Sequence, residues 1–144
     1  MRTGIRLTAE GDSFIARLTS SQRAALRSAL ELLHGSDFSD DAVIVQLGVG
    51  RSEVSRLQDS LVGEDPSTIE DFSLSRQDLH VLHSALTAAA TMHLAQGRYF
   101  TQEPYYHRLG HFREDFDALA HHIAKAVSEA TSKANQNQIQ GKVE

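Results

Sequence analysis

The chain has 144 residues, of which 40% are hydrophobic and 23% charged, and its formal net charge is −5. This length suits one ordinary domain, and the negative charge argues against a bulk electrostatic grip on nucleic acid or anionic lipid. The sequence contains no cysteine, which excludes disulfides and thiolate metal sites and favours the reducing cytoplasm. We expect neither a secretory signal nor a membrane-spanning segment, because no apolar run is long enough.

The N-terminal part predicts a β-hairpin followed by a helix. Residues 5–7 and 14–18 alternate between apolar and polar on either side of a Glu-Gly-Asp-Ser turn, which is typical of a hairpin. Thr19 or the serine after it is a suitable N-cap for a helix with apolar positions between Leu26 and Leu33. We expect Gly35 to end this helix with a positive φ.

A short strand and a second helix are predicted next. Apolar residues alternate over 43–47, which favours a strand. Ser52 is then expected to open a helix whose apolar positions extend to Leu61, and Gly63 is expected to close it. A Glu-Asp-Pro-Ser stretch follows as a linker.

The second half of the chain predicts the same order of elements. Residues 69–74 read as a strand, and Ser75 with Asp78 forms the pattern of a capping box. The helix that follows is expected to stop at Gly97, and a short strand is expected over 105–109.

The last predicted helix has apolar residues from Phe112 to Val127. Residues 131–144 are polar and carry no apolar stripe, so we predict that they form a disordered tail.

Two stretches of the sequence correspond to each other. VQLGVGRSEVSRLQDSLV (45–62) and HRLGHFREDFDALAHHIA (107–124) share Leu-Gly, an arginine three residues later and matching apolar positions. Upstream, residues 26–30 resemble residues 82–86. We therefore predict a helix-rich α+β single domain of two tandem β-α-β-α repeats, because units this small cannot bury a core alone. The predicted units cover residues 1–64 and 65–130.

The polar positions of the two repeats diverge, which favours a non-catalytic protein-binding module over an enzyme. A small bacterial inhibitor, immunity-type or regulatory protein would have this character. The predicted contact surfaces are an acidic loop, which suits a basic partner, and a tyrosine-rich loop. Their residues are Asp37, Asp40, Asp41, Tyr99 and Tyr106. No cofactor and no membrane partner are predicted. The sequence does not decide whether the protein forms a homodimer.

DNA binding is the alternative hypothesis. The stretch LGVGRSEVSRL (47–57) resembles the turn and recognition helix of helix-turn-helix proteins. This interpretation requires residues 39–46 to form a helix instead of a strand. Ile44 counts against it, because the motif places a small residue there. The residues expected to face the major groove are Arg51, Ser52, Ser55 and Arg56.

A metal-dependent enzyme is the third hypothesis, since seven of the eight histidines lie in the second half of the chain. His80 and His83 are spaced to share one helix face, and His111, Asp115 and His122 share another. No metal site is predicted, because the spacing does not match the HExxH helix of zinc enzymes and the chain has no cysteine. Histidines that face solvent from a helix are the simpler explanation.

Overall fold

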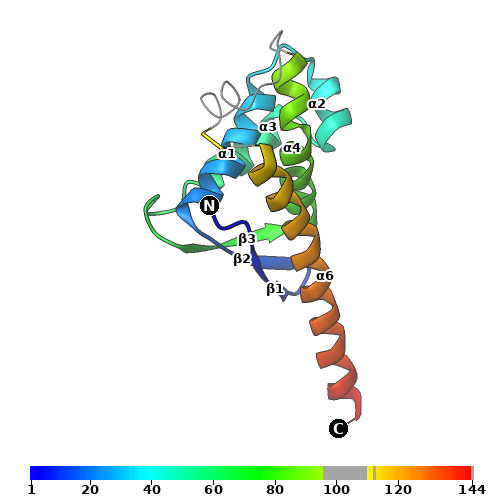
Figure 1. The fold of residues 1–144 in the computed structure, drawn as a ribbon. Coiled ribbons are helices and arrows are strands. Elements are labelled where there is room, and N and C mark those ends of the chain that lie inside the picture. The colour runs from blue at the N-terminus through cyan, green and yellow to red at the C-terminus, as the bar shows by residue number, and fades with distance from the viewer. Residues whose placement is uncertain (96–109, 112, 144) are drawn as a thin grey trace.

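The computed structural model describes residues 1–95, 110–111 and 113–143, and for 93–95 and 138–143 it describes the backbone only. In these ranges the chain is an α+β single domain with one three-stranded antiparallel sheet and five helices (Figure 1). The predicted α+β class is confirmed. The strand predicted over 105–109 and the helix end predicted at Gly97 lie outside the described residues.

The sheet combines the predicted hairpin with a strand from the middle of the chain. β1 (Arg6–Glu10) and β2 (Ser13–Leu18) are antiparallel, and the turn between them contains Gly11 at φ 58°. β3 (Glu70–Ser75) pairs antiparallel with the other edge of β2, so the order is β1-β2-β3. Both the hairpin and the later strand were predicted.

One face of the sheet is buried and the other faces solvent, because successive side chains of a strand point to opposite faces. Phe14, Ala16 and Leu18 of β2 and Leu74 of β3 are buried. Arg17, between two of them, is exposed. The helices therefore cover a single face of the sheet.

α1 (Ser20–His34) begins at the predicted N-cap. The Thr19 hydroxyl accepts a hydrogen bond from the Gln22 amide at 3.1 Å, and the Gln22 side chain accepts one from the Thr19 amide at 3.0 Å. This capping box satisfies two of the free amides of the first turn. The positive φ predicted for Gly35 is wrong: φ is −84°. The Gly35 amide donates to the Glu31 carbonyl at 2.8 Å without a left-handed residue.

Residues 43–47 form a helix, and the strand predicted there is wrong. α2 (Asp40–Leu47) is capped by Ser39, whose hydroxyl accepts a hydrogen bond from the Ala42 amide at 3.2 Å. Val43 and Leu47 are fully buried, whereas the valine between them, Val45, is 85% exposed. Two apolar residues four positions apart suit a helix face as well as a strand, and the serine cap decides for the helix.

α3 (Arg51–Ser60) begins one residue before the predicted Ser52, and Leu61 is its C-cap. Val54 and Leu57 are buried as predicted. The chain then enters a loop in which Gly63 has a φ of 70°.

α4 (Arg76–Ala95) follows β3 directly and begins with the predicted capping box. The Asp78 amide donates to the Ser75 hydroxyl at 2.9 Å, and the Ser75 amide donates to the Asp78 carboxylate at 3.0 Å. α4 packs against α1 over the buried face of the sheet. Residues fully buried in this core include Leu26, Leu30, Leu82 and Leu86.

α6 (Arg113–Val143) packs on α4 and on the hairpin, and it buries Phe116, Leu119 and Ile123. The structure describes this helix as continuing through 131–143, where we predicted a disordered tail. Extending an existing helix costs far less than nucleating one, and this stretch contains no proline. In Figure 1 the end of α6 passes beyond the sheet to the C terminus.

None of the helices in the described part of the chain combines the length and the apolarity that are needed to cross a bilayer.

Candidate functional site

α2, the turn after it and α3 form a helix-turn-helix. Gly48 caps α2 in the left-handed region at φ 82°, and its amide donates to the Ile44 carbonyl at 2.7 Å. The Arg51 amide at the start of α3 donates to the Asp40 carboxylate at 2.8 Å. A Cβ on Gly50 would lie 2.9 Å from the same carboxylate, so glycine permits this close approach.

The inward face of this helix pair is apolar. Val43, Leu47, Val54 and Leu57 are buried in the main core, and the turn residue Val49 is partly buried against it. Ile44 points partly to solvent, with 42% of its surface exposed. The helical precondition of the helix-turn-helix hypothesis holds, although DNA binding does not follow from it.

Arg51 is engaged with the loop between α1 and α2. Its Nε donates to the His34 carbonyl at 3.2 Å, and its Nη2 donates to the Ser36 carbonyl at 2.9 Å and to the Phe38 carbonyl. Three carbonyls, one at the end of α1 and two in the loop after it, thus accept hydrogen bonds from a single guanidinium. These contacts use Nε and Nη2, and they leave fewer donors of Arg51 for a DNA phosphate or base.

Arg56 lies on the solvent side of α3 and is paired twice. Its Nε lies 3.0 Å from the Glu53 carboxylate, and its Nη2 lies 2.9 Å from the Asp78 carboxylate. Hydrogen bonds to Glu53, and then to Asp78, raise the pKa of Arg56. Because Asp78 also caps α4, Arg56 joins the middle of α3 to the start of α4.

The other two residues of the predicted DNA-contacting set are serines, and neither side chain makes a hydrogen bond within the described residues. Ser52 is exposed and Ser55 is half-buried, and acidic Glu53 and Asp59 are exposed on the same helix. α3 therefore presents a face without net positive charge, which does not suit a polyanion.

The predicted acidic loop is a loop only in part: Asp37 lies in the loop before α2, whereas Asp40 and Asp41 form the first turn of α2. Asp37 and Asp41 are exposed, whereas the Asp40 carboxylate caps α3 and has a structural role. Ile44 and Val45 lie three and four residues after Asp41, on the same side of α2, and Val45 is highly exposed. The predicted tyrosines Tyr99 and Tyr106 lie outside the described residues.

A buried arginine that the sequence analysis missed organises the loop between α3 and β3. Arg23 of α1 is 3% exposed, and its Nη1 lies 3.0 Å from the Glu70 carboxylate and 2.9 Å from the Val62 carbonyl. Its Nη2 donates to the Asp65 carbonyl at 3.1 Å and to the Thr68 carbonyl. The guanidinium also lies over the Phe72 ring, 5.4 Å from its centre. Only the position of Arg23 on the apolar side of its helix could have signalled this burial.

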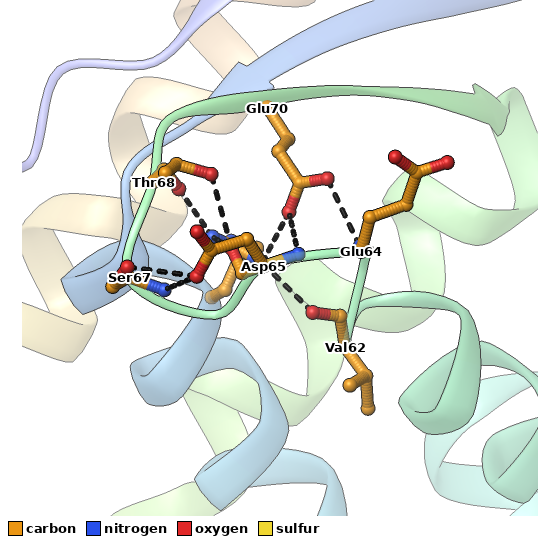
Figure 2. Close-up of polar contacts among 7 residues, drawn as sticks. Val62, Glu64, Asp65, Ser67, Thr68 and Glu70 are labelled. Carbon is orange, nitrogen blue, oxygen red and sulfur yellow. Dashed lines mark hydrogen bonds and ion pairs between the residues drawn. The ribbon is translucent and has the colours of Figure 1, made fainter.

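Figure 2 shows the polar contacts of this loop between Val62 and Glu70. The Glu70 carboxylate also accepts the Glu64 amide at 3.0 Å, and Asp65 accepts the amide and hydroxyl of Ser67. These hydrogen bonds from Ser67 lower the pKa of Asp65. The ion pair and the carbonyls occupy both Nη groups of Arg23, and in this way the cluster holds the loop. The Arg23 Nε is buried and has no hydrogen-bond partner among the described residues.

The histidines do not assemble into a metal site in the described part of the chain, where no three His, Asp or Glu side chains come together around one point. The His80 ring packs beside Gly48, and the His111 ring lies 5.8 Å from the Phe116 ring. Burial lowers the pKa of His111, against the opposing effect of Asp115. The side chain of His93 and all of His107 lie outside the described residues.

No protein-family model matches the chain, and no curated protein or solved structure shows significant similarity to it.

Proposed function

We propose that the protein is a non-catalytic protein-binding module that contacts its partner through α2 and the loop before it. The observation that carries the proposal is the high exposure of Val45, 85%, next to exposed Ile44 on a well-capped helix. Phe38 in the preceding loop is also exposed. Grouped apolar side chains at a surface are typical of interaction sites.

The chemistry of the partner follows from the charges around these residues. Asp37 and Asp41 are exposed beside the apolar side chains, and the whole protein carries a net charge of −5. A partner segment with apolar residues flanked by lysine or arginine would complement this surface. Arg51 and Arg56 would keep their internal contacts, so the module binds without rearranging α3.

The test is capture from a lysate of the source organism, followed by identification of the protein that is retained. Val45→Asp is the disrupting variant, and Ile69→Asp is its matched control, because Ile69 is another exposed aliphatic residue (55%) on a different surface. Retention of one stoichiometric protein by wild type and Ile69→Asp, and not by Val45→Asp, supports the proposal. Equal retention by all three, or by none, contradicts it.

DNA binding is the second candidate function, and the helix-turn-helix formed by α2 and α3 favours it. Fluorescence anisotropy with a random-sequence duplex pool at low salt tests it, with Arg56→Ala as the variant. We expect no saturable binding. The DNA hypothesis would be favoured if one duplex sequence from the pool bound the protein and if Arg56→Ala weakened that binding. The binding surface would then be α3.

We also infer that the scaffold arose by duplication, although the strand predicted over 43–47 in the first unit is the helix α2. The capping box of Thr19 and Gln22 corresponds to that of Ser75 and Asp78. Corresponding buried pairs are Leu26 and Leu82, Leu30 and Leu86, Val54 and Phe116, and Leu57 and Leu119. Superposition of β2, α1 and α3 on β3, α4 and α6 in an experimental structure would test this origin.

A further inference from the structure

A groove lies between the first turns of α4 and the middle of α6. It has a volume of about 320 Å³, near the lower end of the roughly 300–1,000 Å³ typical of small-molecule sites. It is far along α4 from Ala95, where the described part of that helix ends. The groove belongs to neither the α2 surface nor the Arg23 cluster.

The floor of the groove is apolar and comes from both helices. Leu79 of α4 and Ile123 of α6 are buried beneath it, and Val127 is partly buried along one side. Ala124 is exposed at the edge and leaves the groove open to solvent. An aliphatic or aromatic group placed here would remove apolar surface from water on both sides of the contact.

The rim of the groove is basic. Arg76, His80 and His83 follow one another along the same side of α4, and no residue that lines the groove is acidic. Within the described residues, none of these three side chains takes part in an ion pair or hydrogen bond. This differs from Arg23, Arg51 and Arg56, which all have partners inside the protein.

We propose that this groove binds a small amphiphilic anion, namely a carboxylate with an aliphatic or aromatic tail. The tail would lie on Leu79, Ile123 and Val127. The carboxylate would accept hydrogen bonds from the Arg76 guanidinium, which forms strong charge-assisted pairs with carboxylates. His80 and His83 add N–H donors along the same rim. This inference is independent of the protein-binding function proposed above.

The experiment is an NMR titration of the full chain with sodium octanoate, and with 1-octanol as the uncharged probe. We expect saturable shifts confined to the amides of 76–83 and 123–127. Arg76→Gln should weaken octanoate binding about tenfold, the loss expected from one charged hydrogen bond, and leave octanol binding unchanged. Ala124→Trp, at an exposed position, should fill the groove and abolish binding of both probes.

Lys133→Gln is the matched control, because it removes an exposed positive charge from α6 outside the groove. Wild-type affinity in this variant supports the site. The proposal is overturned if the shifts do not saturate, or if Lys133→Gln weakens octanoate binding as much as Arg76→Gln does. Unchanged binding in a folded Ala124→Trp protein, with folding verified by circular dichroism, also overturns it.

Discussion

Two arginines each hold one loop of this protein by donating to backbone carbonyls, but they do so in different surroundings. Arg23 holds the loop between α3 and β3 from inside the core, and Glu70 neutralises its charge. Arg51 holds the loop between α1 and α2 from a partly buried position, and no carboxylate pairs with its guanidinium in the described residues.

The same pattern of hydrogen bonds can therefore contribute differently to the free energy of unfolding, depending on its surroundings. Loss of the buried Arg23 side chain would leave the Glu70 carboxylate and several carbonyls without their partner, which is costly. Loss of Arg51 would leave carbonyls that water can reach. The two loops should therefore differ in their sensitivity to substitution.

The largest effect is expected from Arg23→Met. Because Glu70 is 21% exposed and can regain some hydration, we expect the free energy of unfolding to fall by about 3 kcal/mol, the lower end of the range for breaking a buried pair. Urea denaturation measures it. Arg17→Met is the control, since Arg17 and Asp71 form an exposed pair worth less than about 1 kcal/mol. An equal fall in the free energy of unfolding in the two variants would show that the buried Arg23 pair contributes no more to stability than the exposed Arg17 pair.

Gly63→Ala should have the next largest effect, because it perturbs the same loop through the backbone. Gly63 has a φ of 70°, and an added Cβ would clash with the Glu70 carboxylate. We expect a loss of about 2 kcal/mol or more, from left-handed strain and displacement of Glu70. In Gly11→Ala, at a φ of 58° with nothing within 4 Å, only the strain applies. Thermal unfolding of both variants separates these contributions.

Arg51→Met should destabilise the protein by about 1–2 kcal/mol, from the loss of hydrogen bonds that are partly replaced by water. Amide exchange should become faster in residues 35–39 and at the start of α2. Exchange in residues 62–69 should not change, because Arg23 holds that loop independently. Faster exchange in both loops would mean that they open as one unit.

Acidification should produce the smallest effect and act on the Arg23 loop. The pKa of Asp65 is lowered in the folded state by hydrogen bonds from Ser67. The ionised carboxylate therefore stabilises the folded loop above the unfolded pKa of about 3.9, and this contribution is lost as the pH falls through the lower folded value. NMR titration of Asp65, with amide exchange at Ser67, measures it. A pKa of Asp65 at or above its ordinary value would contradict this contribution.

Local signals explain most of what was predicted correctly. The hairpin turn, the Thr19 cap and the capping box of Ser75 and Asp78 all depend on residues within a few positions of one another. The prediction failed at 43–47, where alternation and helical spacing coincide and only the direction of the core distinguishes them. The candidate site was predicted in part: Asp37 and Asp41 are exposed, but Asp40 is occupied as a cap and the apolar face of α2 was not foreseen.

The sequence by itself determined the hairpin and the starts of α1 and α4, because capping boxes and tight turns use donors and acceptors of neighbouring residues. Only the tertiary structure decided which charged side chains are free. Arg23 meets Glu70, and Arg51 meets the carbonyls after α1, across long separations in the chain. Arg76 has no such partner among the described residues and lines an apolar groove, which exists only because α4 and α6 pack together. Such pairings depend on how the helices are placed around the core, which local patterns do not encode.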